Sequence, residues 1–250
     1  MGRGRSKVGG GGGQRANTPS GIDMQQFNAM TMDQKISTIN TIIADPSIVV
    51  PAHVDDSETS KVLYALGMDN KPTVVDDATL DSMPGRELFR TVYESGFMPP
   101  PSSKEIADQV KFADYTQMSG SGGSVHGRAL YFATSFGASA VYGTGWGQRK
   151  QLVMRGKLNP NANIQNESRF FSGQEWSDFR SKYNGNSRDA KAMFALSKGI
   201  DGWHDSFGYD MIINRGILTM SSTNKHISVS GRGKSSSSIA RNWSAAKTLK

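Results

Sequence analysis

The sequence predicts an α+β protein. Helical spacing dominates its first third, where Ile36, Ile39, Ile42 and Ile43 recur on one helix face. After residue 85, short β-branched and aromatic runs typical of strands alternate irregularly with helical segments. Because no regular strand–helix–strand alternation is present, these observations favour an α+β rather than an α/β architecture.

Composition excludes several classes of protein. The 250-residue chain has no cysteine, so it contains neither disulfides nor Cys-ligated zinc. Its four histidines are scattered without metal-ligand spacing, so we expect no metal site. No apolar run approaches the length of a membrane span, and no secretory signal is visible at the N-terminus, so we expect no membrane contact.

Charge and complexity divide the chain into four regions. Residues 1–20 form a Gly-rich basic arm, 21–84 a helical N-terminal region, 85–230 the main domain, and 231–250 a Ser-rich basic tail. The net charge of +7 comes from the two ends, because residues 23–210 hold 18 basic and 22 acidic residues. Such ends favour contact with nucleic acid or another acidic surface, or serve only as solvated tails.

The N-terminal region predicts two helices. Thr31 and Gln34 have the spacing of a capping box, and Pro46 ends the helix that they begin. A second helix runs from Ser57 to Gly67, and a short turn at 76–83 leads to the main domain.

The main domain mixes strands with helices. We expect strands at 88–92, 129–133, 152–155, 209–213, 217–220 and 226–230. Helices are expected near 102–110, from Thr134-Ser135 to Tyr142, and at 173–183 and 187–198. Breaker-rich loops cover 95–101 and 116–128.

Four segments of the main domain stand in an informative order. They are LFR (88–90), GRALYFATSFGASAVYG (127–143), LVMRGKLNPNANI (152–164) and GYDMIINRGIL (208–218). Together they resemble ADP-ribosyltransferases over about residues 85–220. The starting MGRGRSK and the stretch from Asn214 to Ser222 are similar to those of a group of small phage-encoded proteins. The resemblance implies split antiparallel sheets with helices, and NAD as the cofactor.

Side chains in these segments suit a dinucleotide. Arg90 can hold phosphate or ribose oxygens through its guanidinium, and Tyr131 offers a face for nicotinamide stacking. Thr134 and Ser135 can bind a ribose hydroxyl or cap the following helix, and Tyr142, two turns further, can close the pocket. The resemblance places the backbone of Thr91, where the families usually have Gly, at the nicotinamide amide. Each side chain also has a structural reading, as core, cap or ion-pair partner.

The expected catalytic carboxylate departs from the family pattern. ADP-ribosyltransferases usually place a Glu at the start of the strand that here begins at Gly208, and this chain has no Glu after Glu175. Asp210, which shares a strand face with Gly208, is the better substitute, and Asp205 is the second. The alternative is that Asp210 has only a structural role.

Two functions therefore remain open. The first is a phage-encoded mono-ADP-ribosyltransferase that cleaves NAD and modifies a host protein or nucleic acid. The second is a catalytically inactive protein of the same fold that binds phage capsid or DNA through its basic ends. Either is expected in the host cytoplasm or the phage virion.

Overall fold

The protein is described here by a computed structural model covering residues 18–51, 57–68, 72–93, 129–141, 150–223, 225–228 and 247–248. The helix expected near 102–110, residue Tyr142, and almost all of the basic arm and tail lie outside these described residues.

The N-terminal region begins with three capped helices, α1 (Met24–Ala29), α2 (Met32–Ala44) and α3 (Glu58–Ala65). The predicted capping box is confirmed, because the Thr31 hydroxyl accepts from the Gln34 backbone while the Gln34 side chain accepts from Thr31. Buried Ile36, Ile39 and Ile42 confirm the predicted apolar face of α2.

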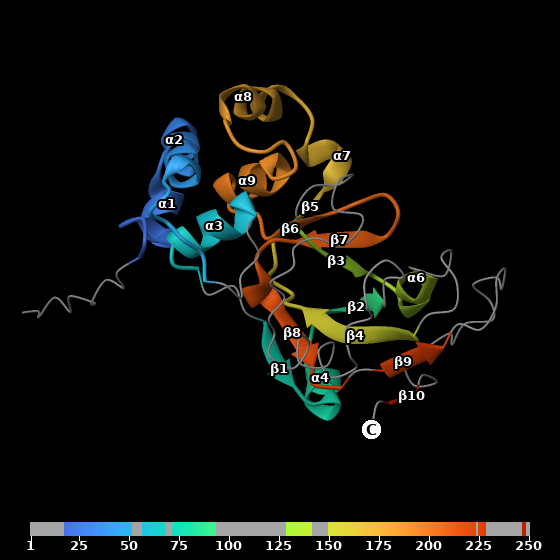
Figure 1. The fold of residues 1–250 in the computed structure, drawn as a ribbon. Coiled ribbons are helices and arrows are strands. Elements are labelled where there is room, and N and C mark those ends of the chain that lie inside the picture. Colours follow the sequence, from blue (N-terminus) through green and yellow to red (C-terminus); the bar gives the residue numbers. More distant parts are fainter. Residues whose placement is uncertain are drawn as a thin grey trace, which may run out of the picture.

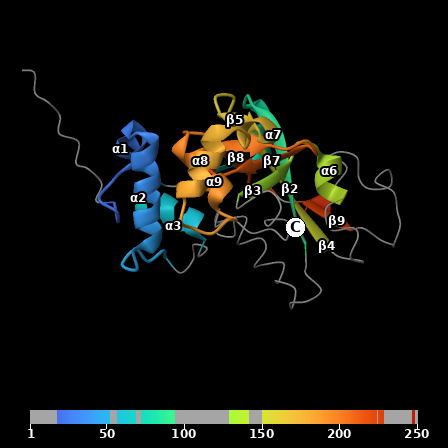
Figure 2. The same ribbon diagram turned by 90° about the horizontal axis from the view of Figure 1, so that it is seen from above.

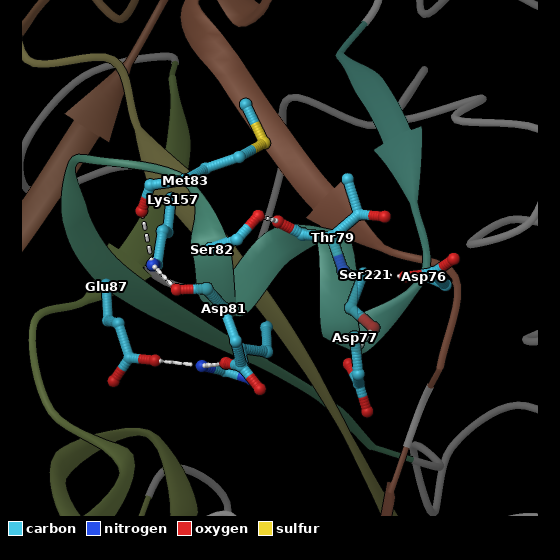
Figure 3. Close-up of polar contacts among 10 residues, drawn as sticks. Asp76, Asp77, Thr79, Asp81, Ser82, Met83, Glu87, Lys157 and Ser221 are labelled. Atoms are coloured by element: carbon cyan, nitrogen blue, oxygen red, sulfur yellow. Dashed lines mark hydrogen bonds and ion pairs between the residues drawn. The ribbon is translucent and has the colours of Figure 1, made fainter.

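Residues 73–82 contain more structure than the predicted turn. They form β1 (Thr73–Val75), which pairs in parallel with β8 (Leu218–Ser221), and α4 (Asp77–Ser82). Figure 3 shows how side chains hold α4 to the sheet. The Lys157 ammonium donates to the carbonyls of Asp81 (3.1 Å) and Met83 (2.6 Å), and the Asp81 carboxylate pairs with Arg155.

The remaining strands form one mixed sheet with β1 and β8 (Figure 1). They are β2 (Arg86–Tyr93), β3 (Leu130–Ala133), β4 (Lys150–Leu158), β5 (Ile164–Asn166), β6 (Gly202–His204), β7 (Tyr209–Ile212), β9 (Lys225–Ser228) and β10 (Lys247–Thr248). The strand order is β1-β8-β4-β2-β3-β7-β6-β5, with β9 beside β4 and β10 beside β9. Pairing is antiparallel except for β1 with β8 and β5 with β6. The sheet with its separate helices confirms the α+β class.

The sheet consists of two halves that meet between β2 and β3. These two strands share a single described register pair, Phe89 with Ala133, whereas β2 and β4 pair along all eight residues of β2. Both halves contribute to one apolar cluster, made of Leu88, Leu130, Phe132, Met154, Leu158, Ile212, Leu218 and Met220. We call the side of the sheet that carries this cluster the inner face.

The opposite side, the outer face, is covered by helices. These are α6 (Phe136–Val141), α7 (Glu167–Phe170), α8 (Gln174–Lys182) and α9 (Ala190–Ser197). The two helices predicted at 173–183 and 187–198 are confirmed as α8 and α9, whereas β5 and β6 were not predicted. In Figure 2, α8 and α9 lie between the N-terminal helices and the strands.

A second apolar cluster joins the N-terminal helices to the outer face. Phe27 and Ile39 belong to it together with Phe194 of α9 and Trp203 of β6. Buried polar contacts reinforce this joint: the Thr59 hydroxyl donates to the Asp189 carboxylate (2.6 Å). The described helices α1, α2 and α3 therefore share a core with the sheet domain.

Candidate functional site

The four segments that carry the family resemblance form neighbouring strands. In spatial order they supply β4, β2, β3 and β7, although 36 residues separate β2 from β3 in sequence. The fold thus gathers Arg90, Tyr131, Thr134, Ser135 and Asp210 in one region of the sheet. Strand alternation then decides which of them share a face.

Tyr131 and Asp210 lie on opposite faces. In the antiparallel pairing of β3 with β7, Tyr131 is opposite Met211 and Phe132 is opposite Asp210. Tyr131 packs, partly buried, against the outer-face cluster that contains Met211, whereas Phe132 belongs to the inner-face cluster. The structure therefore does not bring the Asp210 carboxylate together with the Tyr131 ring.

Arg90 and Thr91 hold β2 to its neighbours. The Arg90 guanidinium donates to the Tyr131 carbonyl (2.9 Å), which reinforces the short β2–β3 junction. Thr91 points the other way, and its hydroxyl donates to the Ser139 carbonyl of α6 (2.7 Å). The Arg90 contact is to a backbone carbonyl rather than to a carboxylate, and the Thr91 contact places this residue beside α6.

Thr134 and Ser135 connect the end of β3 with α6. Both the backbone N–H and the hydroxyl of Thr134 donate to the Gly208 carbonyl, each at 3.0 Å. The exposed Ser135 hydroxyl accepts from the Ala138 N–H (3.2 Å), so it caps the first turn of α6. Tyr142, expected to close the pocket, lies outside the described residues.

Asp210 is sequestered on the inner face. Its side chain is fully buried, one oxygen pairs with the Arg86 guanidinium, and the other lies 2.7 Å from Nδ1 of His204. Both carboxylate oxygens are thus engaged by basic side chains. This placement matches the structural alternative for Asp210 rather than a carboxylate beside a ribose on the outer face.

Asp205 shapes the turn between β6 and β7. Its buried carboxylate accepts from the N–H groups of Phe207 (2.8 Å) and Tyr209 (2.9 Å). The turn ends at Gly208, whose φ of +90° suits glycine. A Cβ at Gly208 would make ordinary van der Waals contact with the Thr134 hydroxyl, at 3.6 Å, while the positive φ would strain any side chain placed there.

Sequence reasoning missed His204, which it treated as one of four scattered histidines. His204 and Asp210 form a register pair across the β6–β7 hairpin. The signal was the turn chemistry of Asp205 and Gly208 between two strand-like runs, which places residues 204 and 210 opposite each other. Recognising β6 would have revealed the pair.

A cavity of about 420 Å³ lies elsewhere, between α1, α3 and the end of α9. Its lining is Met24, Asn28, Leu63, Gly67, Met68, Leu196, Gly199, Ile200, Asp201, Ile213 and Asn214. Since this lining holds no Lys or Arg, the cavity does not suit the two phosphates of a dinucleotide.

Within the described ranges, no group of three or more His, Asp or Glu side chains is arranged to hold a metal ion. The helices in those ranges include none with the length and apolarity that crossing a membrane requires. Comparison with protein-family models, curated proteins and solved structures gives no match.

Proposed function

We propose that this chain is an ADP-ribosyltransferase-like protein that binds NAD beside Tyr131 on the outer face of β3 and does not cleave it. In this proposal the Tyr131 ring stacks on the nicotinamide, and the Thr134–Ser135 end of β3 faces the adjoining ribose. NAD is the ligand that the sequence resemblance implies.

The observation that carries the proposal is the position of Gly208. It lies beside Thr134, where the resemblance expects a glutamate, and as a glycine it supplies no carboxylate there. In this proposal Asp210 does not replace the missing carboxylate, because its buried side chain is already paired with Arg86 and His204. In this proposal Tyr131, Thr134 and Ser135 supply the contacts to NAD, while the carboxylate that stabilises an oxocarbenium-like state is missing.

The second candidate is the active mono-ADP-ribosyltransferase, acting on a host protein or nucleic acid. It is favoured by the spatial adjacency of all four segments that carry the resemblance. In both candidates the protein is phage-encoded and works in the host cytoplasm or the virion, where its basic ends contact DNA or capsid.

Calorimetric titration of NAD into the full-length protein tests binding. We expect saturable binding that Tyr131→Ala weakens about fivefold through loss of stacking. Tyr131→Phe keeps the aromatic face and should bind as the original chain does. Absence of NAD binding, or equal binding by all three proteins, would refute the proposed site.

Labelled NAD incubated with host lysate separates the two candidates. The first predicts no label transfer and no nicotinamide release above the rate in buffer. Transfer that Tyr131→Ala abolishes would establish the second candidate in its place.

A further inference from the structure

The inner face carries a polar cluster that the proposed function does not use. It consists of Arg86 at the start of β2, His204 on β6 and Asp210 on β7. Asp210 is fully buried, whereas the side chains of Arg86 and His204 are 44% and 36% exposed. The buried Asp210 carboxylate thus contacts both the Arg86 guanidinium and the His204 imidazole, which are partly exposed to solvent.

The carboxylate fixes how each group is presented. An ionised carboxylate only accepts hydrogen bonds, so Nδ1 of His204 must be the donor in its 2.7 Å contact with Asp210. The other ring nitrogen, Nε2, is then left to accept from a neutral partner or, on a protonated ring, to donate. Arg86 uses one terminal nitrogen for Asp210, which leaves the rest of its guanidinium fork for other acceptors.

The place of His204 in the sheet makes the cluster accessible to a ligand from solvent. β6 lies next to β5, the last strand in the sheet order, so His204 stands close to a sheet edge. Its neighbour Trp203 points into the outer-face core and is fully buried, which confirms that His204 projects from the inner face. Asn166 is the register partner of His204 on β5, and its carboxamide oxygen accepts from the Arg169 N–H as the cap of α7.

We propose that Arg86 and His204 form a binding site for a terminal phosphate group, with Asp210 as the positioning residue. A phosphate monoester carries close to two negative charges at neutral pH and offers several acceptor oxygens. The Arg86 fork takes two of these oxygens, and Nε2 of His204 meets a third, as donor or as acceptor from a P–OH group. The proposal is independent of NAD binding, because the cluster and Tyr131 lie on opposite faces.

The test is a phosphate titration of the full-length protein at low ionic strength, followed by 1H–15N spectra of the imidazole rings. His204→Gln identifies the His204 signals among the four histidines. We expect His204 to show the Nδ1–H tautomer and to shift saturably with inorganic phosphate. Absence of a saturable His204 shift would overturn the proposal.

Arg86→Gln supplies the decisive variant, and Arg188→Gln is its matched control, because Arg188 is an exposed arginine in the loop before α9. We expect Arg86→Gln to weaken phosphate binding about tenfold, the effect of losing one charge-assisted contact, and Arg188→Gln to leave it unchanged. Equal weakening by both would show only a general charge effect and would refute the site. If Arg86→Gln does not fold, Arg86→Lys replaces it, and the loss of bidentate geometry should still weaken binding severalfold.

Two further ligands distinguish the source of the phosphate. ADP, which ends in a phosphate, should shift the His204 signals as inorganic phosphate does. NAD has no terminal phosphate and should leave them unchanged. A His204 shift with NAD but not with phosphate or ADP would contradict the proposal. The result of the NAD titration with Tyr131→Ala does not affect it, because that variant tests the outer face.

Discussion

The two faces of the β3–β7 pair use adjacent residues for different purposes. On the outer face, Tyr131 and Met211 join an apolar cluster that extends into the N-terminal helices. On the inner face, Phe132 follows Tyr131 in β3 and belongs to the other apolar cluster, while Asp210 precedes Met211 in β7 and binds Arg86 and His204. Successive residues of a strand motif therefore lie in two different environments, so residues adjacent in sequence need not share a site.

The outer-face cluster should show the largest effect on stability. Phe194 is 1% exposed, and its ring centroid lies 5.0 Å from that of Phe170 and 5.3 Å from those of Trp176 and Phe179. Phe194→Ala is expected to lower the free energy of unfolding by about 3–5 kcal/mol. Urea denaturation measures this, with Phe194→Leu as the milder control. Two separate transitions in the original chain would show that the N-terminal helices and the sheet do not share one core.

The inner-face cluster should show an intermediate effect. Asp210→Asn keeps the shape of the side chain but removes the charge that pairs with Arg86, so we expect a loss of about 1–3 kcal/mol of stability. NAD affinity, measured by calorimetry, should stay the same because Asp210 faces away from Tyr131. A large loss of NAD affinity in a folded Asp210→Asn protein would mean that the two faces act on one ligand.

Tyr183 makes the joint between α3 and the loop after α8 sensitive to alkaline pH. Burial, followed by its hydrogen bond to Glu58 (2.6 Å), raises the pKa of the Tyr183 hydroxyl above its usual value. The unfolded chain therefore loses this proton first, and stability falls as the pH rises above about 10. Urea unfolding at pH 8 to 11 should show a shallower decline for Tyr183→Phe, and identical slopes would contradict this prediction.

The cap of α6 should show the smallest effect on stability. Ser135→Ala removes the hydroxyl that accepts from the Ala138 N–H and is expected to cost about 1 kcal/mol or less. Thermal unfolding measures this cost, with Ser135→Thr as the variant that retains a capping hydroxyl. If NAD affinity falls in Ser135→Ala but not in Ser135→Thr, the hydroxyl also serves the ribose.

Local patterns in the sequence predicted most of the helices and strands, but not which strands pair with each other. The capping box at Thr31, the apolar face of α2 and the strand at Leu130–Ala133 follow from short-range chemistry, and the structure confirms them. β5 and β6 were missed because three-residue strands carry too little periodicity to be recognised. The same gap hid the pairing of His204 with Asp210.

The candidate site shows a similar limit. Strand alternation predicted that Gly208 and Asp210 share a face, but it could not show that β3 pairs with β7 so that Tyr131 is opposite Met211. Register is a long-range property, set by how both strands bury their apolar residues. The contacts of Asp210 with Arg86, 124 residues away, are likewise invisible to local patterns.

The proposed function requires that NAD binds at the end of β3 formed by Tyr131, Thr134 and Ser135, and that cleavage is absent for want of a carboxylate at position 208. It is tested most directly by nicotinamide release from NAD in Gly208→Glu, with Gly208→Gln as a control that carries the same backbone strain at positive φ. The account predicts that the original chain and Gly208→Gln bind NAD without measurable release, and that Gly208→Glu gains release. Release by the original chain, or no gain in a folded Gly208→Glu protein that binds NAD, would contradict it.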